Sequence, residues 1–202
     1  MRDIDWNMFT EARKDLIQAS IENRTKWPLY FFGEVGIGKT FLASAIYESW
    51  PTGQPLWMPY TQFCDRCERL RDGRGFTISQ GIQSRDITTF EQWWAYLATV
   101  KLVVIDDFGI LDDLGTADLS GDVLQSRRYR NEWMISLLDI RSNLPLVLTS
   151  NLAIENSLHN NRLRSIHEIF DRRLISRIRA GKVVELGGQD LRGLDYLMDN
   201  IV

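Results

Sequence analysis

The sequence predicts an α/β fold with a five-stranded parallel sheet flanked by helices. Short apolar runs alternate with longer helical stretches along the chain, as expected when helices cover a parallel sheet. A glycine-rich segment separates the first apolar run from a helical stretch. The 202 residues suit one domain. We expect a helix and linker over residues 1–28, followed by a core over residues 29–202.

Five apolar runs are the candidate strands. They cover residues 29–32, 56–58, 102–105, 146–149 and 183–186. The third and fourth show no alternation with polar residues, which indicates burial on both faces. Pro28, Pro55 and Pro145 each stand just before a strand, where a helix cannot continue.

Helices are expected in the intervals between these runs. They cover residues 7–22, 39–49, 61–71, 89–99, 127–141 and 163–179. Thr61 stands where it can cap the third of them. Residues 73–86 are rich in Gly, Ser and Arg, and residues 112–122 are acidic and contain Gly, so both segments are expected to be loops.

Composition limits the possible partners. The net charge is −3 and the pI is about 5.5, so nucleic acid would have to bind a local basic patch or many copies lining a channel. No long apolar run or signal peptide is present, so we expect a cytoplasmic protein without a membrane partner. Cys64 and Cys67 form one Cys-x-x-Cys pair, which we interpret as two thiols on one helical turn.

One motif predicts phosphate binding. It reads Gly33-Glu34-Val35-Gly36-Ile37-Gly38-Lys39-Thr40 and lies between an apolar strand and a helix. Glycines let backbone N–H groups turn onto phosphate oxygens, and the helix N-terminus adds partial positive charge. In such a P-loop, Lys39 reaches the β- and γ-phosphates and the Thr40 hydroxyl holds Mg²⁺. We therefore expect ATP and Mg²⁺ as ligands.

Polar residues follow the third and fourth strands, at the sheet edge where ligands bind in open parallel sheets. Asp106 is expected to help hold Mg²⁺, and Asp107 to activate the attacking water. A polar turn that merely ends the strand is the alternative for both acids. The amide of Asn151 either binds the γ-phosphate or the water, or forms an Asx turn or helix cap.

Two groups of arginines are candidate sites. The first lies among residues 162–182 and is either a solvated basic face or the source of an arginine finger offered to a neighbouring subunit. The second comprises Arg66, Arg69, Arg71, Arg74 and Arg85. It is either a solvated face with interleaved acids or a contact for single-stranded DNA.

Trp93, Trp94 and Trp133 are interpreted as core residues rather than base-stacking platforms.

The order of these motifs resembles the DnaC/IstB branch of the AAA+ ATPases. The resemblance runs from the P-loop through five later segments. They are residues 104–109, 137–141, 148–152, 176–178 and the pair of stretches 183–186 and 189–192, which together form the last segment. It implies that Asn151 is sensor 1, that Arg177 is an arginine finger acting between subunits of a self-assembled oligomer, and that Arg192 is a sensor-2-like arginine contacting nucleotide. Arg173 also stands near the finger position.

The chain departs from this family in one respect. Only about thirty residues precede the first strand, where family members carry a region that grips the helicase or transposase. We expect no C-terminal helical lid after Arg192, as suits this branch. Loading of a replicative helicase is the function expected. An IstB-type transposition helper, a small P-loop kinase and a nucleotide-dependent binding module are the alternatives.

Overall fold

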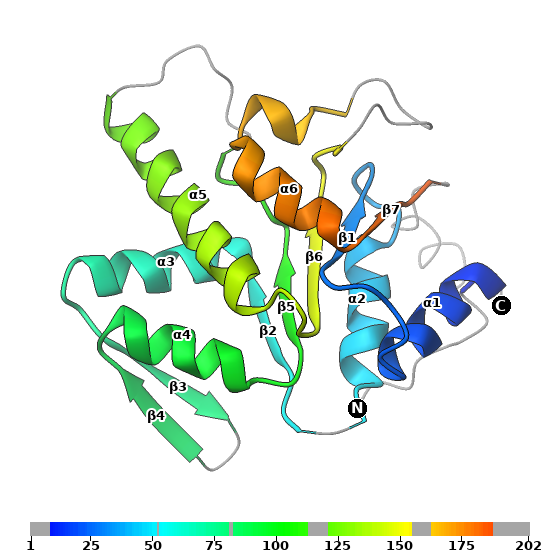
Figure 1. Cartoon of the computed structure of the whole chain (residues 1–202), viewed down its shortest axis with the longest axis horizontal. Helices are drawn as coiled ribbons and strands as arrows, with labels where there is room; N and C mark the ends of the chain where they lie inside the picture. Colours follow the sequence, from blue (N-terminus) through cyan, green and yellow to red (C-terminus); the bar gives the residue numbers. More distant parts are fainter. Residues whose placement is uncertain (1–8, 52, 81–82, 113–120, 155–162, 188–202) are drawn as a thin grey trace, which may run out of the picture.

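The computed structural model describes residues 9–51, 53–80, 83–112, 121–154 and 163–187. Its centre is a five-stranded sheet in the order β2-β5-β6-β1-β7, and every pairing is parallel (Figure 1). The strands are β1 (Leu29–Phe32), β2 (Leu56–Pro59), β5 (Val103–Asp106), β6 (Leu146–Ser150) and β7 (Lys182–Glu185). The predicted five-stranded parallel sheet is therefore confirmed.

Helices cover both faces of the sheet. Alternate residues of a strand point to opposite faces. Leu29 and Phe31 pack with α1 (Glu11–Ile21) and α2 (Lys39–Glu48), whereas Tyr30 and Phe32 belong to the core on the other face. That second core includes residues of α3 (Tyr60–Arg71), α4 (Phe90–Thr99), α5 (Gly121–Ile140) and α6 (Arg172–Ala180). The sheet thus separates α2 from α5 and α6.

The segment expected to be a loop at residues 73–86 is largely a β-hairpin, so that expectation was wrong. Strand β3 (Phe76–Gln80) pairs antiparallel with β4 (Gln83–Ile87). Ile78 and Ile87 are buried, and the ring of Phe76 packs edge-on against Trp93. These few apolar contacts hold an otherwise polar hairpin on the domain.

Several helix ends differ from expectation. Helix α3 begins at Tyr60 after Pro59, and no side chain caps it, so Thr61 is not its cap. Helix α5 begins at Gly121 rather than at residue 127. The expected helix at 163–179 is two elements, the short η3 (Ile166–Glu168) and α6. Asp171 interrupts it, because its carboxylate caps α6 by accepting from the Arg173 and Leu174 N–H groups.

Arg141 is a buried arginine just beyond the end of α5. Its guanidinium donates to the carbonyl oxygens of Leu97 at 2.6 Å, Val100 at 2.9 Å and Pro145 at 2.5 Å. Burial lowers its pKa to about 10. The side chain therefore joins the end of α4 to the segment before β6.

The two cysteines lie on one turn of α3, as predicted, and both thiols are buried. Burial raises the pKa of each thiol, which makes both thiols poor nucleophiles.

Among the described residues, no helix combines the length and apolar character that crossing a membrane requires.

Candidate nucleotide-binding site

The glycine-rich loop leads from the end of β1 into α2. Gly38 has φ 87° and directly precedes the first residue of α2, a left-handed conformation that favours glycine. At Gly33 the constraint is space, because an added Cβ would lie 2.3 Å from the carbonyl oxygen of Leu186. Glycine thus lets the loop begin against the chain that follows β7. The first N–H groups of α2 have no partners within the helix and suit an anion.

Lys39 is the first residue of α2, and only 6% of its surface is exposed. Its Nζ donates to the carbonyl oxygens of Gly33 at 3.0 Å and Glu34 at 2.6 Å. The ammonium is therefore held across the loop that precedes it. A buried ammonium is stabilised by an anionic partner, and phosphate is such a partner.

Asp106 joins three elements at the sheet edge. Its Oδ1 accepts from Thr40 Oγ1 of α2 at 3.1 Å and from the hydroxyl of Thr149 in β6. A carboxylate and a hydroxyl oxygen side by side are the ligand types that Mg²⁺ takes in proteins. Thr40 and Asp106, predicted as metal ligands, are thus brought together, and the residues present fit such an ion.

Asp107 lies beside Asp106 but adopts a different conformation. Its φ is 55°, in the left-handed region, and the residue is exposed whereas Asp106 is half-buried. Non-glycine residues held in this region cost about 1–3 kcal/mol and cluster at functional sites. Two contacts to Thr149 stabilise the turn: Asp107 N–H donates to Thr149 Oγ1 at 3.0 Å, and Phe108 N–H donates to the Thr149 carbonyl at 2.7 Å.

Asn151 lies at the tip of β6 and lines a small depression together with Asp107 and Gly109. The turn here is held by another residue. Ser150 Oγ donates to the Phe108 carbonyl at 2.7 Å and accepts from Leu152 N–H at 3.1 Å. Ser150 thus holds the turn after β6, and the role of Asn151 stays a prediction. The amide of Asn151 stands next to Asp107 at the edge of the sheet.

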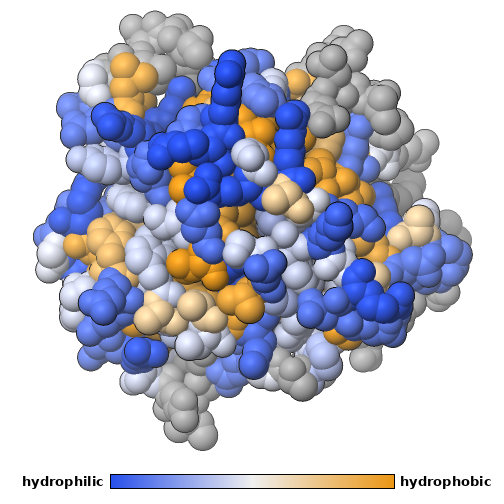
Figure 2. All heavy atoms as spheres, viewed as in Figure 1, coloured by the Kyte–Doolittle hydropathy of each residue, from blue (hydrophilic) through white to orange (hydrophobic). Residues whose placement is uncertain are grey.

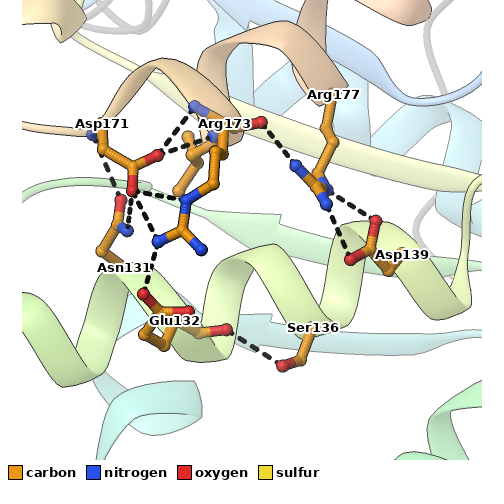
Figure 3. Close-up of polar contacts among 8 residues, drawn as sticks. Asn131, Glu132, Ser136, Asp139, Asp171, Arg173 and Arg177 are labelled. Carbon is orange, nitrogen blue, oxygen red and sulfur yellow. Dashed lines mark hydrogen bonds and ion pairs between the residues drawn. The ribbon is translucent and has the colours of Figure 1, made fainter.

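The arginines of α6 lie on the other side of the sheet from α2. Arg177 donates to both carboxylate oxygens of Asp139, and Arg173 contacts Asp171 and Glu132 (Figure 3). Arg177 and the P-loop of its own chain are therefore on different faces. Arg192 lies outside the described residues.

Four arginines of the second group contact other residues of the chain. The Arg66 guanidinium lies over the rings of Phe76 and Trp93, and burial lowers its pKa. Arg69 donates to the Gly75 carbonyl. Arg71 and Arg74 both pair with Asp72. Hydrophilic residues are spread over the face in view rather than gathered in one place (Figure 2). Trp93 and Trp133 are buried, which confirms them as core residues, and Trp94 is half-buried.

Thr149 is the residue of this site whose role the sequence did not predict. Its position beside Asn151 at a strand end was a signal, but the two acids it contacts are far away in sequence. We expect Thr149→Val to lower the ATP turnover by about tenfold, since it removes the hydroxyl that connects Asp106 to the Asp107 backbone. Phosphate-release kinetics would measure it, with Thr99→Val as a control remote from this edge. Unchanged turnover would contradict the positioning role.

Solved structures resemble this fold. One is AMPPCP-bound DnaA from Aquifex aeolicus, with TM-score 0.58, 18% identity, and coverage of 95% of this chain and 53% of that chain. Another is the DnaC helicase loader, with TM-score 0.55 and 15% identity. The match covers 88% of this chain and 92% of that chain. The chain has the fold of a DnaC-type AAA+ protein. No protein-family model and no curated protein sequence matches it.

This is the fold that the resemblance drawn from the motifs implied. The chain spans about half the length of the DnaA chain but nearly all of the DnaC chain. In the strand order β2-β5-β6-β1-β7, the P-loop follows β1 and the two acids lie at the end of β5, with β6 between them. The contacts of Thr149 in β6 to both acids follow from that order.

Proposed function

We propose that this chain binds ATP with Mg²⁺ and hydrolyses it at the carboxyl edge of its parallel sheet. One observation carries the proposal: Thr40 from the P-loop helix and Asp106 from β5 meet within hydrogen-bond distance. Lys39 directly precedes Thr40, and its ammonium is held across the loop. The AMPPCP-bound DnaA structure supports a nucleotide as the ligand of this fold.

The residues divide into three roles. The loop N–H groups and Lys39 would hold the phosphates, and Thr40 and Asp106 would hold the metal ion. Bound Mg²⁺ would neutralise charge on the phosphate oxygens. Asp107 would accept a proton from the attacking water, and Asn151 beside it would orient that water or the γ-phosphate.

The DnaA and DnaC structures support a role in DNA replication, with loading of a replicative helicase as the specific activity proposed. Single-stranded DNA and a helicase are then the expected partners. The position of Arg177 on the face opposite α2 supports completion of the site by a second copy of the chain.

Lys39→Ala tests the assignment of the binding site. The substitution should reduce ATP affinity by at least tenfold while the fold persists, because it removes the ammonium that spans the loop. Titration with a fluorescent ATP analogue would measure it, and circular dichroism would check the fold. Lys26→Ala, at an exposed position before β1, should bind like the wild type. Equal affinity in Lys39→Ala would rule out this loop as the phosphate site.

A second assay separates the DNA-directed ATPase from a small kinase. Phosphate release should rise when single-stranded DNA is added to the wild-type protein at low salt, and the rise should fade with added salt. A kinase would instead transfer phosphate to a metabolite and would not respond to DNA. Hydrolysis that is indifferent to DNA at all salt concentrations would count against the DNA-directed role.

A further inference from the structure

Helices α5 and α6 are joined by a row of polar contacts on the face opposite the P-loop helix (Figure 3). At one end the buried side chain of Asn131 exchanges hydrogen bonds with Asp171, the residue that caps α6. Farther along the two helices, Asp139 receives Arg177. The row therefore fixes the start of α6 and places Arg177 against α5.

Arg177 and Asp139 form a bidentate ion pair. Arg177 Nε donates to Asp139 Oδ1 at 2.5 Å, and Nη2 donates to Oδ2 at 3.0 Å. Nη1 donates to the Arg173 carbonyl at 2.9 Å. A guanidinium has five N–H groups. These three contacts use three of them, and among the described residues one N–H on each terminal nitrogen remains unengaged.

The geometry has a chemical consequence. Asp139 binds the side of the guanidinium that carries Nε, which leaves N–H groups on the two terminal nitrogens. A pair of terminal N–H groups can bind an oxyanion such as phosphate. The carboxylate therefore fixes the plane of the guanidinium without using up its capacity for a second anion.

We propose that Asp139 is a positioning residue that holds Arg177 in the orientation in which it reaches the γ-phosphate bound by a neighbouring subunit. This inference rests on the proposed function, in which Arg177 acts between subunits. An arginine side chain has high rotamer entropy. A guanidinium that is already held in place loses less of this entropy when the phosphate binds. Arg173, which also stands near the finger position, pairs with Glu132 and Asp171 at the start of α6.

A mixing experiment tests the proposal. The acceptor subunit carries Arg177→Ala and keeps its P-loop, and the donor carries Lys39→Ala and keeps its arginine. Hydrolysis by the mixture, with donor in excess, reports the donor arginine. Two further donors add Asp139→Asn or Glu132→Gln to Lys39→Ala. Asp139 is 54% exposed, so its near-isosteric replacement should leave the fold intact, which thermal unfolding of each donor would check.

The Asp139→Asn donor should give a kcat at least tenfold below that of the parent donor, with the acceptor's KM for ATP unchanged. An Asp139→Glu donor should recover part of the loss, and the Glu132→Gln donor should match the parent. Equal kcat from the Asp139→Asn and parent donors would overturn the positioning role and leave the trans-acting arginine intact. A higher kcat would also overturn it, because Asp139 would then restrain Arg177. No rescue by the parent donor would overturn the trans-acting arginine itself.

Discussion

Arg177→Ala is expected to reduce the turnover of the assembled ATPase by about 10³–10⁵-fold, with little change in ATP affinity. The arginine lies on the face of the sheet opposite α2, so we expect no contact between it and nucleotide in its own P-loop. Its positive charge would act on the transition state in a neighbouring subunit. Steady-state phosphate release at high protein concentration measures the turnover, and titration with a fluorescent ATP analogue measures the affinity.

Arg172→Ala is a matched control for this prediction. Arg172 is exposed, lies in the first turn of the same helix, and forms no ion pair with a described residue. Its removal should leave turnover within a few-fold of the wild type. If Arg177→Ala kept full turnover and Arg172→Ala lost most of it, the trans-acting arginine would be Arg172 instead of Arg177.

Asp107→Asn is expected to lower kcat by about 10²–10⁴-fold while ATP still binds. The substitution removes the carboxylate that would accept a proton from water, yet Asn is among the few residues that tolerate a φ of 55°. The backbone turn held by Thr149 should therefore persist. Single-turnover hydrolysis would isolate the chemical step from nucleotide binding and product release.

Asp106, the neighbouring acid, provides a comparison for the Asp107→Asn variant. Asp106→Asn should weaken the Mg²⁺ dependence of nucleotide binding, because Asp106 contacts Thr40 whereas Asp107 shares a depression with Asn151. The two variants should thus differ in which step they impair. If Asp107→Asn keeps wild-type kcat, the general base is another acid and the separation of roles at this strand end is wrong.

Much of the fold was predictable because its signals are local. Apolar runs, four of them bounded by proline or glycine, located all five strands of the sheet within a residue or so of their ends. The hairpin was missed because several of its positions are exposed and polar, as at Thr77 and Ser79, whereas Ile78 and Ile87 are buried. The break before α6 was missed because Asp171 is held by Asn131, forty residues earlier.

The residues of the candidate site also fall into those that local sequence predicts and those that it does not. The P-loop and the two acids could be predicted, since each role follows from residues adjacent in the chain. The contacts of Thr149 depend on the pairing of β5 with β6, and that of Asp139 with Arg177 depends on the packing of α5 against α6. Such contacts join residues about 40 positions apart, and no local pattern specifies them.

The dependence of ATPase activity on protein concentration tests most directly whether the site is completed between subunits. Phosphate release per mole of wild-type protein would be measured across a wide concentration range, with sedimentation of the same samples to follow assembly. Specific activity should rise steeply as the protein assembles, and Arg177→Ala should remain low throughout. Specific activity that stays constant from monomer to assembly would show that one chain contains the whole catalytic site.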